Sequence, residues 1–266
     1  MITESFDRAT PAIISPVPQE NRPQADVCII TFSGMIEQYA RERYGGVPIA
    51  SLKCATGDTP VYLIERKGKR IAFYQTYVGA PITVGLAEDA AAALDCRSFI
   101  LFGGAGCLNK EIAHGKVMIP TAAFRDEGTS YHYAPAADYI EVKKAPFVAE
   151  CMEKNGIPFV LGKTWTTDAI YRETRGNFAK RKAEGCISVE MECAGLQAMC
   201  DFRGLSLYAF FTSGDLLDAP EWDARRTEGD LSGTQHDVGH FDVALALAEY
   251  VAGKERRAEP TGLEIR

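Results

Sequence analysis

The stretch SFILFGGAG, residues 98–106, joins five mostly apolar residues to three glycines within four positions. Ser98–Phe102 has the length and composition of a buried β-strand. The glycines of Gly103–Gly106 lack a Cβ, so that backbone amides there can approach a ligand closely. A tight turn into the next strand is the alternative reading of the same residues. The run is not a GxGxxG motif and no helical pattern follows it, which disfavours a dinucleotide-binding fold.

Strand and helix patterns alternate on the N-terminal side of this stretch. The apolar residues 27–32 predict a strand, and residues 35–44 predict the helix that follows it. Residues 61–65 and 71–75 flank a polar turn and predict a hairpin. An alanine-rich helix is expected over about residues 80–94.

The same alternation continues after residue 106. It predicts strands at 116–120, 158–166 and 205–212, and helices at 147–154, 190–202 and 241–252. The pattern implies an α/β fold, a single-domain three-layer α/β/α arrangement with a mixed central β-sheet. Ligands in such folds bind at the carboxyl ends of strands, so functional residues are expected in the segments after strands.

Length and composition indicate one sizeable globular domain. Of the 266 residues, 46% are hydrophobic and 24% are charged, enough for a large enclosed core. Residues 1–25 contain four prolines and are expected to form an irregular arm, followed by the domain at 26–255 and a C-terminal tail at 256–266. No window approaches the roughly 20 apolar residues of a membrane helix, and the start lacks a secretory pattern, so a cytoplasmic protein that binds no membrane is expected.

Charge and cysteine usage narrow the classes of partner. The formal net charge of −7 disfavours nucleic acid, which binds to a basic face, and favours a small-molecule ligand. The eight cysteines include no CxxC pair, which indicates small buried residues in a reducing compartment rather than disulfides or a zinc site. With four histidines and no HExxH spacing, no metal site is expected.

One candidate segment places two carboxylates and a methionine, Glu190, Met191 and Glu192, at the predicted start of a helix. Acidic residues in a first helical turn commonly do no more than complement the helix dipole. Here the flanking residues are apolar, which argues against an open face. In a cleft, a carboxylate accepts hydrogen bonds from ribose hydroxyls, and a methionine packs on the sugar.

A second candidate is Asp215, which follows the strongly apolar strand predicted at 205–212. An aspartate in a loop is usually a turn former or a helix cap. Its place after a central strand favours a functional role at the ligand-binding edge of the sheet.

Together these segments resemble the nucleoside phosphorylase family, which includes uridine phosphorylase, hexameric purine nucleoside phosphorylase and methylthioadenosine nucleosidase. The resemblance runs from about Val27 to Tyr250. Residues 119–135, IPTAAFRDEGTSYHYAP, look most like the corresponding stretch of the uridine phosphorylases. Residues 77–81 resemble the family's other glycine-rich turn, and residues 166–171 its base-stacking loop.

The resemblance implies a role for each of these segments. Asp215 stands where the purine-acting members keep a general acid that protonates the leaving base, a carboxylate that the uridine phosphorylases lack. Residues 119–135 therefore point to a pyrimidine and Asp215 to a purine. The other implied residues are ribose-binding Glu190, Met191 and Glu192, base-binding Ala105, Gly106, Ile170 and Tyr171, and Gly103 and Gly104 in the loop that faces phosphate or another nucleophile.

The arginines with which the family binds phosphate have no clear match. The Gly-Asp-Pro-x-Arg turn after the first strand is replaced by Thr31–Met35, and Leu101 occupies the place of a second arginine. A third has no counterpart in residues 54–60, and the pyrimidine-reading Gln-x-Arg pattern survives at best as Glu173–Arg175. Three other arginines remain as possible replacements, namely Arg125, Arg172 and Arg175.

Three functions remain open on these grounds. Phosphorolysis of a nucleoside, with inorganic phosphate as co-substrate and no other cofactor, is the expected reaction. Hydrolysis by water is the alternative because the phosphate arginines are missing, and a non-catalytic nucleoside-binding protein is the second alternative. The resemblance also implies a homo-oligomer, a dimer or hexamer, with His132 near a subunit contact.

Overall fold

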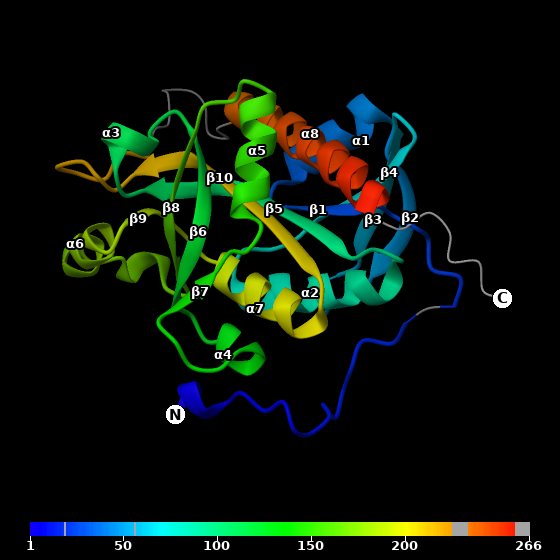
Figure 1. The fold of residues 1–266 in the computed structure, drawn as a ribbon, viewed down its shortest axis with the longest axis horizontal. Helices are drawn as coiled ribbons and strands as arrows, with labels where there is room; N and C mark the ends of the chain where they lie inside the picture. Colours follow the sequence, from blue (N-terminus) through cyan, green and yellow to red (C-terminus); the bar gives the residue numbers. More distant parts are fainter. Residues whose placement is uncertain (19, 56, 225–233, 259–266) are drawn as a thin grey trace.

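A mixed β-sheet with helices on both faces forms the body of the protein (Figure 1). The computed structural model describes residues 1–18, 20–55, 57–224 and 234–258. The strands are β1 (Val27–Thr31), β2 (Val47–Leu52), β3 (Thr59–Arg66), β4 (Lys69–Gln75), β5 (Ser98–Cys107), β6 (Val117–Asp126), β7 (Tyr139–Glu141), β8 (Phe159–Thr167), β9 (Cys186–Glu190) and β10 (Ser206–Leu216). The helices are α1 (Gly34–Tyr44), α2 (Ala80–Ala93), α3 (Lys110–Ala113), α4 (Ser130–Tyr133), α5 (Ala145–Lys154), α6 (Arg175–Ala183), α7 (Cys193–Arg203) and α8 (Thr234–Ala258), with 3-10 turns η1 (Ile2–Glu4) and η2 (Ile170–Arg172).

The predicted α/β class and three-layer arrangement are confirmed. In Figure 1, α1, α5 and α8 cover one face of the sheet, and α2 and α7 cover the other. Successive residues of β1 alternate between the two resulting cores: Val27 and Ile29 contact one, Cys28 and Ile30 the other. Because both faces are buried, such a strand reads as a continuous apolar run rather than an alternating one.

The sheet brings the carboxyl ends of several strands together. β5 pairs in parallel with β1 on one side and with β10 on the other. β10 also pairs with β6, and β6 pairs with β8. β8 in turn pairs with β9, which pairs with the end of β5. These five strands, β5, β10, β6, β8 and β9, therefore close on themselves. At their junction Gly106 is opposite both Val189 and Asp215, and Glu190 is opposite Thr166.

The structure corrects three local expectations. Gly103–Gly106 continues β5 instead of forming a turn, and Asp215 lies within β10, beside an irregularity in the pairing between Ser213 and Asp215. Residues 186–190 form β9, so the helix predicted at 190–202 begins at Cys193. Pairing with both β5 and β8 holds residues 186–190 in a strand, and this outweighs the helical pattern that begins at Glu190.

Other elements lay outside the sequence-based prediction. β2 and α6 were not predicted, and neither were the short β7, α3 and α4. α8 extends to Ala258, three residues into the stretch expected as a tail, and residues 259–266 lie outside the described part of the chain. No helix among the described residues is both long and apolar enough to cross a bilayer.

The glycines of β5 generate a packing prediction. A Cβ on Gly106 would lie 2.5 Å from Leu217 Cδ1 and 2.7 Å from Val189 Cγ1, whereas a Cβ on Gly104 would meet only Gly214 Cα, at 3.8 Å. Gly106→Ala is therefore expected to lower the free energy of unfolding by about 1–3 kcal/mol through overpacking. Gly104→Ala, the matched control, should change it little. Urea denaturation measures both, and equal stabilities of the two variants would contradict this packing.

Candidate active site

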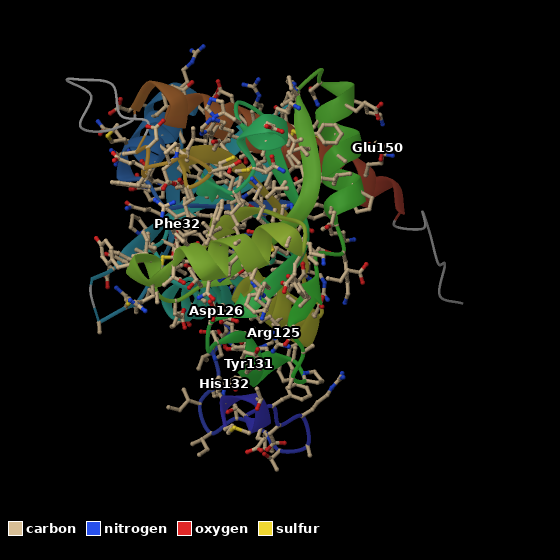
Figure 2. The ribbon with its side chains drawn as sticks, turned by 90° about the vertical axis from the view of Figure 1, so that its left-hand side faces the viewer. Phe32, Arg125, Asp126, Tyr131, His132 and Glu150 are labelled. Carbon is tan, nitrogen blue, oxygen red and sulfur yellow. The ribbon has the colours of Figure 1, made fainter. Side chains whose placement is uncertain are left out.

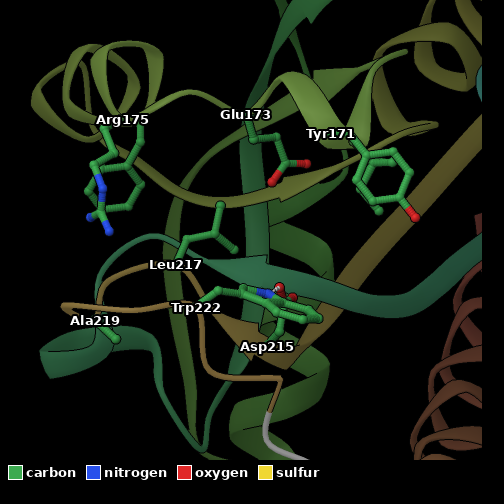
Figure 3. A pocket seen from close by; sticks show the side chains of 9 residues that line it. Tyr171, Glu173, Arg175, Asp215, Leu217, Ala219 and Trp222 are labelled. Carbon is green, nitrogen blue, oxygen red and sulfur yellow. Dashed lines mark hydrogen bonds between the residues drawn. The ribbon is translucent and has the colours of Figure 1, made fainter.

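Two adjoining cavities lie at the carboxyl ends of β5, β9 and β10. The inner cavity, about 220 Å³, is lined by Gly103–Gly106 and by Val189–Glu192, with Phe32, Val78 and Phe211 among its other walls. The outer cavity, about 520 Å³, is lined mainly by Tyr171, Arg175, Phe178, Leu217, Ala219 and Trp222 (Figure 3). Ile170, Glu173 and Asp215 line both cavities, which makes them the junction between the two.

The residues predicted for the site meet at these cavities. Gly103, Gly104, Ala105, Gly106, Ile170, Glu190, Met191, Glu192 and Asp215 line the inner cavity, and Tyr171 lines the outer one. Glu192, at the start of α7, and Asp215, in β10, thus line the same cavity. Ile170 and Tyr171 are 54% and 95% exposed, so η2 presents them at the mouth.

Glu190 is buried at the end of β9, and protein donors occupy both of its oxygens. Oε2 accepts from the backbone N–H groups of Glu192 (2.8 Å) and Cys193 (2.7 Å), and Oε1 accepts from the hydroxyls of Thr166 (2.5 Å) and Thr164 (3.3 Å). Glu190 therefore caps the start of α7 and ties it to β8. Its main task in this structure is to hold the turn that follows.

Glu192 lies on that turn, and its carboxyl faces the inner cavity. Oε1 accepts from Gly79 N at 2.6 Å, and Oε2 accepts from Met191 N at 3.2 Å. Burial, followed by the negative charge of Glu190, raises the pKa of Glu192 well above its ordinary value. Each oxygen has lone pairs left for a ligand, since a carboxylate accepts about four hydrogen bonds.

The side chain of Asp215 is held by an aromatic ring across the junction. Trp222 Nε1 donates to Asp215 Oδ2 at 2.7 Å, shown as a dashed line in Figure 3. Trp222 belongs to a loop that folds back on β10, where Leu216 and Asp223 exchange backbone hydrogen bonds of 2.8 and 3.2 Å. The indole therefore fixes the direction of one carboxyl oxygen at the junction.

Glu173 is a site residue that sequence reasoning did not assign. Its sequence context shows only a remnant of a base-reading pattern, yet Glu173 lines both cavities. Burial, reinforced by the charge of Asp215, raises the pKa of Glu173 to about 7. No signal in the sequence pairs these two acids, because they belong to separate segments that only the closed sheet brings together.

The lining of the inner cavity is acidic. Its described residues include the four carboxyl groups of Glu173, Glu190, Glu192 and Asp215 and no lysine, arginine or histidine. Leu101, at the position of an expected arginine, is buried in the core, and Ser33 caps α1 by accepting from Ile36 N. The positions that the resemblance associates with phosphate are thus used for packing and for a helix cap.

Of the three candidate replacement arginines, one reaches a cavity. Arg125 is buried elsewhere, where it donates to Ser130 Oγ and to the carbonyls of Ala134 and Pro135 and lies over the Tyr131 ring. Figure 2 shows Arg125, Tyr131 and the exposed His132 together near α4, well separated from Phe32. Arg175 lines the outer cavity and donates to Pro220 O at 2.7 Å.

Arg172 is exposed and lines neither of the two cavities.

In the part of the chain that the structure describes, no group of histidine, cysteine and acidic side chains is arranged to hold a metal ion. The two cavities therefore contain carboxylates that accept hydrogen bonds from hydroxyl or amino groups of a ligand. They also contain an acid, Asp215, at their junction, and most of their other walls are apolar.

The raised pKa of Glu173 generates a pH prediction. Its folded-state pKa of about 7 exceeds the ordinary value of 4.5, so the stability it contributes is complete below pH 4.5 and is lost as pH rises through 7. Glu173→Gln does not titrate and is expected to lose less stability than the wild type between about pH 5 and pH 8. Thermal midpoints measure this, with the exposed Glu221→Gln as control. Parallel pH profiles for Glu173→Gln and the wild type would contradict the placement of Glu173.

Comparisons with known proteins bear on the same residues. Residues 26–237 match the family model described as the Phosphorylase superfamily. A DeoD-type purine nucleoside phosphorylase of Exiguobacterium sp. (strain AT1b) is 28% identical over 157 residues, which cover 57% of this chain and 65% of that protein. Uridine phosphorylase of Escherichia coli (strain K12) is 30% identical over 160 residues, which cover 53% of this chain and 62% of that protein.

A longer match is to a DeoD-type purine nucleoside phosphorylase of Clostridium novyi (strain NT), 24% identical over 190 residues, which cover 69% of this chain and 78% of that protein. The chain spans a little less than two thirds of the length of the first two relatives. The family model covers most of the chain, including the strands and turns that line both cavities, and confirms the resemblance seen in the sequence. The chain belongs to the phosphorylase superfamily.

Proposed function

We propose that this protein cleaves the N-glycosidic bond of a nucleoside, with the sugar in the inner cavity and the base directed toward the outer one. The observation that carries the proposal is that Glu192 and Asp215 line the same cavity. The names of the relatives, which are purine nucleoside and uridine phosphorylases, support the same class of reaction.

The sugar is bound chiefly by Glu192 in this proposal. Its carboxylate accepts hydrogen bonds from ribose hydroxyls, while Met191 packs against the apolar face of the ring. Glu190, whose oxygens are already occupied by backbone and threonine donors, keeps Glu192 in position. The sugar is thereby oriented for attack at C1′.

Departure of the base depends on Asp215. The bond between C1′ and the base nitrogen breaks, its electron pair goes to the base, and Asp215 supplies a proton or hydrogen bond to the base. Positive charge builds up on the sugar, where the nearby carboxylates stabilise it. Ala105, Gly106, Ile170 and Tyr171 border the base.

The nucleophile distinguishes two candidate reactions. In phosphorolysis, a phosphate oxygen attacks C1′ to give a pentose 1-phosphate, with backbone amides near Gly103 and Gly104 facing the anion. The relatives' names favour this reaction. Inorganic phosphate is then the co-substrate and no other cofactor is needed.

Hydrolysis is the second candidate, and the charge of the inner cavity favours it. A phosphate dianion normally requires cationic or several amide partners, and the described lining offers four carboxyl groups and no cationic side chain. Water carries no charge to be repelled. Attack by water gives the free pentose, and the water's proton passes to a carboxylate or to solvent.

One assay separates these reactions. The protein is incubated with a panel of purine and pyrimidine nucleosides, with and without phosphate, and the products are identified by chromatography. Pentose 1-phosphate identifies phosphorolysis, and free pentose that forms equally without phosphate identifies hydrolysis. Tight nucleoside binding with no base released under either condition would contradict catalysis and leave a nucleoside-binding protein.

The oligomeric state and the cellular location of the protein are also part of what we propose. A homo-oligomer, dimer or hexamer, in the cytoplasm is expected, and a neighbouring copy is a further source of groups that face the nucleophile. Light scattering of the purified protein measures the oligomeric state.

Asp215→Asn tests the acid. Asparagine keeps the size of the side chain but loses the carboxyl proton, so kcat is expected to fall about 10²- to 10⁴-fold while nucleoside affinity changes much less. Steady-state kinetics and calorimetric binding measure the two effects. Asp138→Asn, an exposed aspartate outside both cavities, is the matched control. An unaltered kcat in Asp215→Asn would remove Asp215 as the acid.

A further inference from the structure

Glu173 is a half-buried acid at the junction of the two cavities that the proposed mechanism leaves without a role. It follows η2 and lines both cavities. Among the described residues, none forms a hydrogen bond or ion pair with its carboxyl group, in contrast to Glu190 and Glu192. Figure 3 shows the carboxyl extending into the outer cavity from the side opposite Asp215 and Trp222.

The surroundings of Glu173 are otherwise mainly apolar. Phe178, Leu217 and Ala219 line the outer cavity beside it. Among the described lining residues, the one guanidinium is that of Arg175, which donates to a backbone carbonyl of the 217–224 loop. An acid in such a place costs free energy unless a ligand satisfies it. A cavity of about 520 Å³ is within the usual range of small-molecule sites, about 300–1,000 Å³.

The charge state of Glu173 follows first from its burial and then from the charge of Asp215. The two acids repel each other when both are ionised. Above its pKa of about 7, the Glu173 carboxyl group is ionised. An ionised carboxylate accepts hydrogen bonds and donates none.

We propose that Glu173 selects the base by accepting a hydrogen bond from an exocyclic amino group, so that the preferred substrates are nucleosides of amino-bearing bases. This inference rests on the proposed function. An oxo group at the same position presents lone pairs to the carboxylate and is repelled, whereas an amino group donates to it. A site built around one hydrogen-bonding pattern strongly rejects the analogue that lacks it, because buried polar groups are then left without partners.

The substitution Glu173→Gln tests the selection. A glutamine amide turns either its carbonyl or its NH₂ toward the base, so that it accepts from an amino group or donates to an oxo group. The two matched substrate pairs are adenosine with inosine and cytidine with uridine, in which an amino group beside an unprotonated ring nitrogen is exchanged for an oxo group beside a ring N–H. Base release is followed under the phosphate condition that the wild type requires, and kcat and KM are determined separately.

The expected result has two parts. The wild type prefers the amino member of the pair that it cleaves, and Glu173→Gln lowers the amino-to-oxo ratio of kcat/KM by about tenfold or more. Glu221→Gln, which removes an exposed carboxylate next to Trp222 but lines neither cavity, leaves the ratio unchanged. Binding of adenine and hypoxanthine, measured by thermal shift, gives a second readout that does not depend on turnover, and far-UV circular dichroism checks the fold.

Two different failures are distinguishable. An active wild type that prefers oxo bases, or a Glu173→Gln ratio that changes less than about tenfold, overturns the assignment of Glu173 and leaves glycosidic cleavage intact. A wild type that releases no base from any of the four nucleosides overturns the proposed function and the inference with it.

Discussion

A buried carboxylate, that of Glu190, fixes the turn on which the site depends. Burial of a carboxylate is costly unless its oxygens are hydrogen-bonded, and here two backbone N–H groups at the start of α7 and two threonine hydroxyls of β8 satisfy them. Thr166 Oγ1 in turn accepts from Ala194 N at 3.1 Å, which adds a further link to α7. The turn between β9 and α7 therefore has little freedom, and Glu192 faces the cavity.

The class of the fold was readable from the sequence because strands buried on both faces leave continuous apolar runs. Residues 27–31 and the hairpin at β3 and β4 are of this kind, and they form as predicted. β9 was missed because it is short and leads directly into a segment with a helical pattern. Only its pairing with β5 and β8, partners distant in the chain, identifies it as a strand.

Residues of the candidate site could be predicted where a short segment has a distinctive sequence of its own. The glycine run of β5 and the acids after β9 are such segments, and they line a common cavity with Asp215. Glu173 carries only the weak signal of a partial base-reading pattern, because its environment is created by β10, α6 and the 217–224 loop together. The capping role of Glu190 was equally hidden, because it depends on threonines of another strand.

Trp222 gives the molecule a built-in optical reporter. The chain has two tryptophans, and they differ in environment: Trp165 is 1% exposed and donates to Asp126, whereas Trp222 is 68% exposed and borders the outer cavity. A molecule that enters this cavity changes the solvent around the indole of Trp222 and leaves Trp165 as it was. Intrinsic fluorescence of the unlabelled protein therefore follows occupancy of the cavity directly, with the interior tryptophan as a constant background.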